Sequence, residues 1–156
     1  AMLTYYLDTS AAVKLYVPEV GSGWIRSLLT PTPKPVVLSS LLLRVEMRSA
    51  FARRLREGTV TAADYAAMCH LFDQHRVALY RLSPVSEMVI QQACALVERH
   101  PLRGYDAVHL ATALFLNQQL IKTGIQRPLT FLSAEYNLLK AVACMGFITD
   151  NPNAHP

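Results

Sequence analysis

The sequence predicts an α/β fold in which short, mostly parallel strands form a central sheet covered by helices. Short aromatic and aliphatic runs alternate along the chain with longer segments of helical composition, which is the order expected of a parallel sheet layered with helices. With 52% hydrophobic and 17% charged residues, the chain has enough apolar content to bury a core instead of remaining disordered. Its 156 residues suit one domain, and no repeat or linker divides them.

The first elements follow from an apolar run and its terminators. Asp8 closes the first run, and Thr9 and Ser10 are residue types that cap helices. The helix after them stops before Pro18, because proline cannot continue a helix. This part of the chain is therefore expected to contain a strand at residues 3–7, helices at 10–16 and 23–29, a proline-rich loop at 30–35 and a strand at 35–38.

The middle of the chain is predicted to contain three helices and one strand. Ser39 and Ser40 are expected to cap a long helix that runs to about Glu57 and is terminated by Gly58. The next helix starts at Thr61. It carries an apolar stripe for which core packing is the favoured interpretation, formed by Tyr65, Met68, Cys69 and Phe72. A strand at 77–82 and a helix at 86–99 complete this part.

The last third repeats the helix–strand alternation. After a loop at 101–104, we expect a helix at 106–121 that closes near Gly124. A strand at 129–132 leads to Ser133, which is expected to cap a helix ending at Gly146, and a short strand follows at 147–149. We predict a single domain over residues 2–152 and a C-terminal tail over 153–156.

Charge and cysteine content narrow the classes of function. Fifteen Lys and Arg against eleven Asp and Glu give a net charge of +4, which is compatible with nucleic-acid binding without establishing it. The three cysteines, Cys69, Cys94 and Cys144, form no CxxC pair, so a zinc site or disulfide framework is disfavoured and we expect small buried side chains. Charged residues interrupt every apolar stretch before membrane-spanning length, and we expect a cytoplasmic protein.

Four carboxylates stand where parallel α/β proteins bind ligands, at the carboxyl ends of strands and the starts of helices. Asp8 and Glu135 follow predicted strands, and Asp106 begins an apolar helix. Each also has a structural interpretation, as a helix cap or as an acid in the first turn of a helix. His109, three residues after Asp106, is interpreted first as a satisfied core histidine.

Glu46 is the most unusual of the four carboxylates. On a helical period it shares a face with Leu42, Leu43 and Ala50. A carboxylate on an apolar face costs free energy unless it is paired, hydrogen-bonded or bound to metal. Arg53 lies on the same face and is one candidate structural partner, although two helical turns separate the residues.

Taken together, the carboxylates favour a divalent metal centre. Converging carboxylates repel one another unless a cation lies between them, and oxygen ligands suit Mg²⁺ or Mn²⁺. Metal bound in this way orients a water molecule and stabilises the negative charge of a phosphate. The reaction class indicated is metal-assisted phosphodiester hydrolysis.

The sequence also resembles the PIN-domain ribonucleases, in particular the VapC-like toxins of bacterial toxin–antitoxin pairs. The resemblance extends over residues 2–152, and its first and third motifs together are fairly specific. The segments that carry it are YLDTSAAVKLY at 6–16, RVEMRSA at 44–50, GYDAVHLATA at 104–113, and TFLSAE at 130–135 with the LLKA, Gly146 and Asn-Pro that follow.

This resemblance implies a Rossmann-like α/β/α sandwich and a Mg²⁺- or Mn²⁺-dependent endoribonuclease. Asp8 and Asp106 would be the main metal-binding positions, Glu46 would complete the acidic centre, and the Ser10 hydroxyl would orient metal-bound water or ligands. Where the family often has Asp after the fourth strand, this chain has Glu135. The longer side chain leaves open whether Glu135 acts directly or through water, and how many metal ions bind.

The resemblance further implies an RNA substrate, homodimerisation, and inhibition by an antitoxin that docks a helix into an apolar groove. For RNA binding, the basic candidates lie on two stretches, Arg53, Arg54 and Arg56 on one and the pair Arg99 and Arg103 on the other. A solvated helix end is the competing interpretation for each, and we select Arg53, Arg54 and Arg103 as the RNA-binding set.

Two alternatives remain at this point. A different α/β enzyme is disfavoured because no GxxxxGK[ST] or GxGxxG motif is present, and because Asp8 lacks the neighbouring acids of aspartate-nucleophile phosphatases and receiver domains. A degenerate PIN fold kept as an RNA- or protein-binding module is supported only by Glu135, and retention of the other three acids argues against it.

Overall fold

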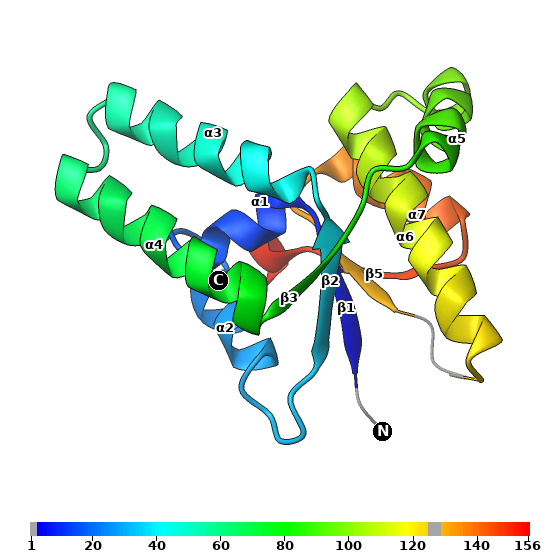
Figure 1. Ribbon diagram of the computed structural model, residues 1–156, viewed down its shortest axis with the longest axis horizontal. Helices are drawn as coiled ribbons and strands as arrows, with labels where there is room; N and C mark the ends of the chain where they lie inside the picture. The colour runs from blue at the N-terminus through cyan, green and yellow to red at the C-terminus, as the bar shows by residue number, and fades with distance from the viewer. Residues whose placement is uncertain (1–2, 125–128) are drawn as a thin grey trace.

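The computed structural model describes residues 3–124 and 129–156; Met2, where the domain is expected to begin, lies outside them. Within these residues, five parallel strands form one sheet in the order β3-β2-β1-β4-β5 (Figure 1). The predicted fold class is therefore confirmed. The strands are β1 (Thr4–Leu7), β2 (Val36–Ser40), β3 (Tyr80–Ser83), β4 (Thr130–Leu132) and β5 (Ile148–Asp150).

Helices cover both faces of the sheet, so the layers are α/β/α (Figure 1). One face carries α1 (Thr9–Ala12), the 3-10 turn η1 (Val13–Leu15), α2 (Ser22–Leu28), α3 (Leu43–Arg56) and α4 (Ala62–Ala78). The other carries α5 (Glu87–Arg99), α6 (Gly104–Lys122) and α7 (Tyr136–Cys144).

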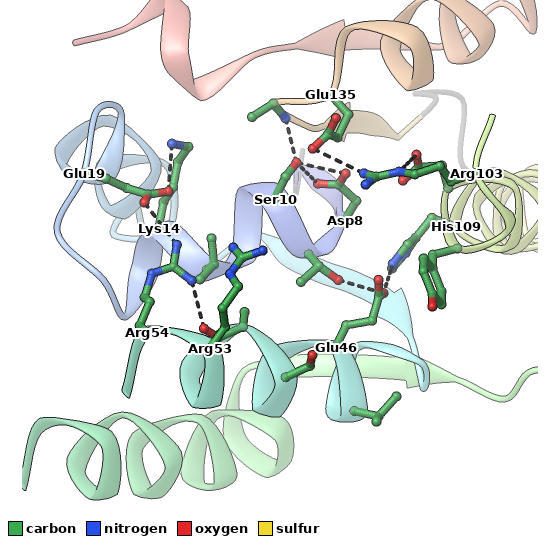
Figure 2. Close-up of a pocket in the computed structure, with 18 of the residues that line it drawn as sticks. Asp8, Ser10, Lys14, Glu19, Glu46, Arg53, Arg54, Arg103, His109 and Glu135 are labelled. Carbon is green, nitrogen blue, oxygen red and sulfur yellow. Dashed lines mark hydrogen bonds and ion pairs between the residues drawn. The ribbon is translucent and has the colours of Figure 1, made fainter. Parts of the chain in front are cut away.

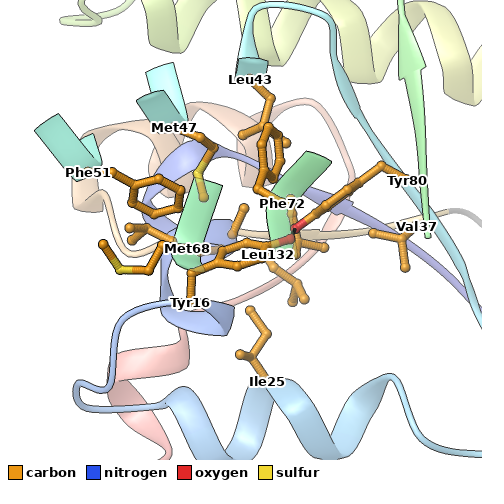
Figure 3. Packing of buried hydrophobic residues seen from close by; sticks show 14 of the residues in the cluster. Tyr16, Ile25, Val37, Leu43, Met47, Phe51, Met68, Phe72, Tyr80 and Leu132 are labelled. Atoms are coloured by element: carbon orange, nitrogen blue, oxygen red, sulfur yellow. Dashed lines mark hydrogen bonds between the residues drawn. The ribbon is translucent and has the colours of Figure 1, made fainter. Parts of the chain in front are cut away.

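The alternation of side chains along β1 divides the core in two. Tyr5 and Leu7 point to the α1–α4 side, whereas Tyr6 points to the α5–α7 side, because successive strand residues face opposite ways. On the first side, the Tyr16 ring makes edge contacts with Phe51 and Phe72 (Figure 3). The stripe of α4 contributes Met68, Cys69 and Phe72 to this core, which confirms the prediction of core packing for these three residues.

The second core brings α6 against the sheet beside β1. Tyr6 stacks on Phe131 of β4 with ring centroids 5.0 Å apart. The N-terminal half of α6 presents a buried face of small and apolar residues, among them Ala107, Leu110 and Ala111. This close packing fixes Asp106, one residue before the buried face begins, at the edge of the sheet where β1 ends.

Three predicted boundaries are wrong, each for a local reason. Ser39 and Ser40 belong to β2 instead of capping a helix: the buried Ser39 hydroxyl donates to the Leu7 carbonyl at 2.6 Å, and α3 begins only at Leu43. The strand predicted at 77–82 is shorter, because α4 continues to Ala78 and β3 starts at Tyr80. The helix that Ser133 was expected to cap begins at Tyr136, and its N-cap is Glu135.

The residues predicted as a tail, 153–156, pack partly against α2. The 3-10 turn η2 (Pro152–Ala154) lies beside Gly21, and the His155 ring stacks on Trp24 with centroids 4.0 Å apart. The His155 Nε2 atom also lies 2.8 Å from an Asp150 carboxylate oxygen. The C-terminal segment therefore joins β5 to α2, and Asn153 reaches the pocket described below.

We expect Gly21→Ala to lower the free energy of unfolding by about 2–4 kcal/mol. Gly21 has a φ of 86°, and a Cβ atom there would overlap the backbone carbonyl of Pro152. Gly58 is a matched control, because its φ is 75° but nothing lies within 4 Å of the position that a Cβ atom would take. Urea unfolding should show a clearly smaller loss for Gly58→Ala; equal losses would contradict the proposed overlap.

The lengths of the helices and the exposure of the cysteines bear on two further expectations. Among the described residues, no helix is long and apolar enough to cross a membrane. All three cysteines are free, as expected, but only Cys69 is buried. The expectation that Cys94 and Cys144 are buried is wrong, because each lies on the exposed side of its helix.

Candidate active site

An open pocket of about 640 Å³ lies at the carboxyl ends of β1 and β4, bordered by α3 and the start of α6. It collects all four predicted carboxylates, Asp8, Glu46, Asp106 and Glu135, together with Ser10. The predicted basic residues Arg53, Arg54 and Arg103 line the same pocket (Figure 2). Residues distant in the sequence thus meet where a parallel sheet binds its ligands.

Asp8 is the most deeply buried acid of the pocket, with 2% of its surface exposed. It is the N-cap of α1, where its Oδ1 accepts a hydrogen bond from the Ala11 amide at 3.0 Å. Hydroxyl groups of Ser10 and Ser133 donate to the same carboxylate at 2.8 and 2.7 Å. Burial raises the pKa of Asp8 to about 6, although these hydrogen bonds act to lower it. Asp8 therefore both caps α1 and places a carboxylate at the floor of the pocket.

Two serine hydroxyls connect the end of β1 to the segment after β4. Ser10 Oγ donates to Asp8 and accepts from the Ala134 amide at 2.8 Å. Ser133 Oγ donates to Asp8 and accepts from the Glu135 amide at 3.0 Å. Each hydroxyl is thereby satisfied as donor and acceptor, so the Asp8 carboxylate is held in one orientation toward the pocket.

Glu46 projects from α3 beside the apolar face formed by Leu43, Met47 and Phe51. Its Oε1 lies 2.7 Å from His109 Nε2 and accepts a hydrogen bond from Thr9 Oγ1 at 2.8 Å (Figure 2). Burial alone would raise the pKa of Glu46, but the hydrogen bonds from His109 and Thr9 lower it below the ordinary value. The carboxylate is therefore held in its ionised form.

His109 is the link between Glu46 and the second core. It is 1% exposed, and its Nδ1 lies 2.8 Å from the hydroxyl of Tyr6. Burial raises the pKa of Tyr6 well above its usual value, so the tyrosine keeps its proton while its hydroxyl bonds Nδ1. Because an ionised carboxylate can only accept, His109 Nε2–H donates to Glu46. The interpretation of His109 as a satisfied buried residue is confirmed, and its second bond reaches the pocket.

Asp106 and Glu135 share one guanidinium group. Arg103 Nε lies 3.4 Å from Asp106 Oδ2, and Arg103 Nη2 lies 3.6 Å from Glu135 Oε1 (Figure 2). The Asp106 side chain is 13% exposed, whereas those of Glu135 and Arg103 are 46% and 68% exposed. The arginine therefore bridges the two acids from the solvent side.

The opposite side of the pocket is basic. Arg54 of α3 is largely buried, donates to the Ala50 carbonyl at 3.0 Å and pairs with Glu19 at 3.5 Å. Lys14 pairs with the same glutamate at 3.1 Å. Arg53 is exposed and lies 4.0 Å from Glu57, its neighbour one turn further along α3. Glu46 is instead bonded to His109 and Thr9. The suggestion that Arg53 pairs with Glu46 is therefore wrong.

Sequence reasoning thus found the acids but missed their supports. The local pattern indicates Thr9 and Ser133 only as helix caps, and Tyr6 only as a strand residue. The adjacency of Thr9 to Asp8 was the one local signal available. The contact between His109 and Glu46 spans 63 positions and has no counterpart in the local pattern.

The donor set fits a hard divalent cation by its chemistry. Carboxylate and hydroxyl oxygens are preferred by Mg²⁺ and Mn²⁺. The partners of the buried Asp8 carboxylate are hydroxyl and amide groups, which leaves its negative charge for a cation to balance. In the arrangement seen, however, no three His, Cys, Asp or Glu side chains among the described residues are close enough to hold a metal ion.

Solved structures share this fold. The chain aligns with the Mycobacterium tuberculosis toxin VapC20, a sarcin-ricin loop cleaving toxin, with a TM-score of 0.62 and 20% identity over 97% of this chain and 99% of that one. It aligns with a chain of a Klebsiella pneumoniae toxin–antitoxin complex with a TM-score of 0.56 and 17% identity, over 95% and 97% of the two chains. At these identities the likeness shows the fold.

The PIN-domain family model matches residues 5–124, so the chain belongs to the PIN-domain family. Its curated relatives in Mycobacterium tuberculosis include Ribonuclease VapC45, which is 37% identical over 109 residues, covering 70% of this chain and 74% of the relative. Ribonuclease VapC47 is 30% identical over 151 residues, covering 96% and 97%. The resemblance to VapC-like PIN ribonucleases is thereby confirmed.

Proposed function

We propose that this chain is an endoribonuclease toxin of the VapC type that hydrolyses RNA phosphodiester bonds with Mg²⁺ or Mn²⁺. The observation that carries the proposal is the pocket itself. The four predicted acids, from four separate parts of the chain, line it, with arginines and a lysine on the opposite side. The chain belongs to the PIN-domain family, and its curated relatives are named ribonucleases. RNA is therefore the substrate class that best suits this pocket.

Asp8, Asp106 and Glu46 are the residues that we assign to metal binding, with Glu135 and Ser10 completing the catalytic set. A bound divalent cation would supply Lewis-acid activation of water and charge stabilisation at the phosphate. The chain's own contribution is orientation. Ser10 fixes Asp8, and the His109–Thr9 pair fixes Glu46 in its ionised form. Such support from neighbouring hydrogen bonds is what holds ligating carboxylates in position.

The basic side of the pocket suits the RNA backbone. Arg53 and Arg54 project from α3 opposite the acids, and Arg103 stands at the rim (Figure 2). Guanidinium groups bind phosphate oxygens through planar, paired donors, and such contacts carry no base sequence. We therefore assign Arg53, Arg54 and Arg103 to binding of RNA phosphates, with no sequence preference of their own.

The same proposal includes partners. A solved chain of similar fold belongs to a toxin–antitoxin complex, which supports a cognate antitoxin for this chain. We further propose a homodimer and a cytoplasmic location, where both RNA and an antitoxin are accessible.

The alternative is a degenerate PIN fold that binds RNA or protein without cleaving. Two observations favour it: Glu135 stands where the family often has Asp, and the carboxylates do not gather in threes among the described residues. A cleavage assay separates the two functions. Purified protein should cut a mixed RNA substrate in Mg²⁺ or Mn²⁺ and lose that activity in EDTA. Binding without cleavage under all metal conditions would establish the alternative.

We expect Glu135→Asp to keep Mg²⁺-dependent activity within about threefold of the parent or to exceed it. The shorter side chain carries its carboxylate away from the Arg103 guanidinium, 3.6 Å away in the parent. The fold should tolerate the change, because Glu135 is an N-cap whose own side chain makes no capping bond and Asp is a favoured N-cap. Initial cleavage rates would measure the effect. Complete loss of activity would show that the longer side chain is required.

A further inference from the structure

Arg103 lies at a position in the pocket where neighbouring acids favour positive charge. Its guanidinium lies 3.4 Å from Asp106 and 3.6 Å from Glu135, which makes it a bridge between two acids of the pocket. The negative charges of Asp106, Glu135 and Glu46 raise the pKa of Arg103, and Arg103 in turn helps to lower the pKa of Glu46. The arginine thus interacts electrostatically with three of the four acids.

The bridge engages two of the acids that a metal ion would need. A divalent cation needs several oxygen ligands around one point. Here two of the four acids are directed at a guanidinium, and no three acids or histidines among the described residues are gathered closely enough for an ion. While they remain paired with Arg103, Asp106 and Glu135 share their negative charge with the guanidinium, which leaves less of it to attract an ion.

We infer that Arg103 is an internal counter-cation that competes with the divalent metal for Asp106 and Glu135, and that it turns to the RNA phosphate when the metal displaces it. The inference rests on the proposed metal-dependent function and adds to it a residue that sets metal affinity. Arg103 then opposes metal binding in the free protein and favours RNA binding in the loaded one.

The exposure of the Arg103 side chain keeps the free-energy cost of this exchange low. The Arg103 side chain is 68% exposed, and exposed ion pairs are worth little in water because solvent and salt screen them. Although Arg103 is the N-cap of α6, its side chain makes no capping hydrogen bond. Its side chain can therefore leave the two acids without loosening α6, which stays packed through Ala107, Leu110 and Ala111.

Displacement would also free a cation beside a phosphate-binding surface. Once metal neutralises the acids, the Arg103 fork faces the pocket without a carboxylate partner, and a phosphate oxygen is the acceptor that it prefers. One side chain then has opposite effects on two ligands. A purely structural ion pair would not produce opposite signs.

Isothermal calorimetry with Mn²⁺ tests the inference. We expect Arg103→Gln to lower the dissociation constant for Mn²⁺ about fivefold at low salt, with the difference shrinking as salt is added. Arg99→Gln is the matched control, because Arg99 is exposed at the end of α5 and is not part of the pocket lining. It should bind Mn²⁺ within about twofold of the parent. The inference would be overturned if Arg103→Gln bound Mn²⁺ as the parent does or more weakly. It would also be overturned if neither the parent nor Arg103→Gln bound Mn²⁺.

A second measurement follows RNA without cleavage. With a 2′-O-methyl RNA that is checked on a gel to stay intact during the measurement, and with saturating Mn²⁺, Arg103→Gln should bind about tenfold more weakly than the parent and show a smaller salt dependence. RNA affinity equal to that of the parent would contradict the second half of the inference.

The parent protein's own NMR signals give a test that needs no variant. The Arg103 Nε–H resonance should shift on titration with Mg²⁺, while that of Arg54, already bonded within α3, should move less. An Arg103 resonance unaffected by saturating Mg²⁺ would also overturn the inference. If the parent binds metal and cleaves RNA while these signs are absent, only the role of Arg103 fails; if the parent does not cleave RNA at all, the proposed function fails.

Discussion

Asp8→Asn is expected to abolish RNA cleavage, with a loss of at least about 100-fold, and at the same time to stabilise the metal-free fold at neutral pH. Activity falls because a neutral amide cannot balance the charge of a cation at the pocket floor. The fold survives because the amide oxygen still accepts from the Ala11 amide, and Asn caps helices as well as Asp does.

The gain in stability follows from the raised pKa of Asp8. Burial brings the pKa from 3.8 to about 6 in the folded state, so the unfolded chain loses this proton at a lower pH. The contribution of Asp8 to stability is therefore most favourable below pH 4 and declines between about pH 4 and pH 6, where only the unfolded carboxyl is ionised. Above pH 6 the penalty is constant at about 3 kcal/mol, an upper limit for the gain in Asp8→Asn.

Urea unfolding in EDTA at several pH values would measure this difference. The Asn variant should match the parent near pH 4 and exceed it at pH 7, whereas the surface control Asp73→Asn should change neither activity nor the pH dependence appreciably. Asp73 is half exposed and pairs only loosely with Arg48 and Arg76. Cleavage by Asp8→Asn at the parent's rate would remove Asp8 from the catalytic set.

The order of strands and helices could be predicted because each element has a local cause. The run before Asp8 is short and apolar, Pro18 ends a helix, and Gly58 and Gly146 follow helices with positive φ values of 75° and 87°. Carboxyl ends of parallel strands meet at one edge of the sheet, so the convergence of the acids on one pocket also followed from the order of elements.

The errors lie where one residue type suits two structures. Ser39 and Ser40 have the chemistry of helix caps, yet in β2 Ser39 bonds a neighbouring strand's carbonyl and Ser40 accepts from the Leu42 amide at 3.1 Å. The apolar residues around Val77 fit a strand or the end of α4 equally well, and only packing decides. Cys94 is exposed because its helix is covered on one side only.

The partners of the site residues depend on tertiary contacts. Glu46 was recognised as an acid that needs a partner, and the wrong partner was suggested because only residues on its own helix could be considered. Its actual partner, His109, reaches it from α6 on the opposite side of the sheet. Arg103 was considered for RNA alone because its pairing with Glu135 likewise spans two elements.

His109→Leu is expected to lower the free energy of unfolding by about 2–4 kcal/mol and the cleavage rate by about tenfold to a hundredfold. Leucine fills a similar volume but removes the His109 partner of the buried Tyr6 hydroxyl and leaves the Glu46 carboxylate with Thr9 alone. An unpaired polar group in a buried position costs its full desolvation penalty. The stability loss therefore comes from hydrogen bonding, with little from packing.

The pH dependence of cleavage distinguishes a positioning role from simple destabilisation. Burial raises the pKa of Glu46 and the His109 hydrogen bond lowers it, so removing His109 should raise this pKa. The ionised form is the active one, so the acid side of the pH–rate profile should move to higher pH in His109→Leu. His70→Leu, the same change at an exposed position of α4, should leave both profile and stability near those of the parent. A stability loss with an unmoved acid limb would show that His109 serves the core alone, and that Thr9 suffices to keep Glu46 ionised.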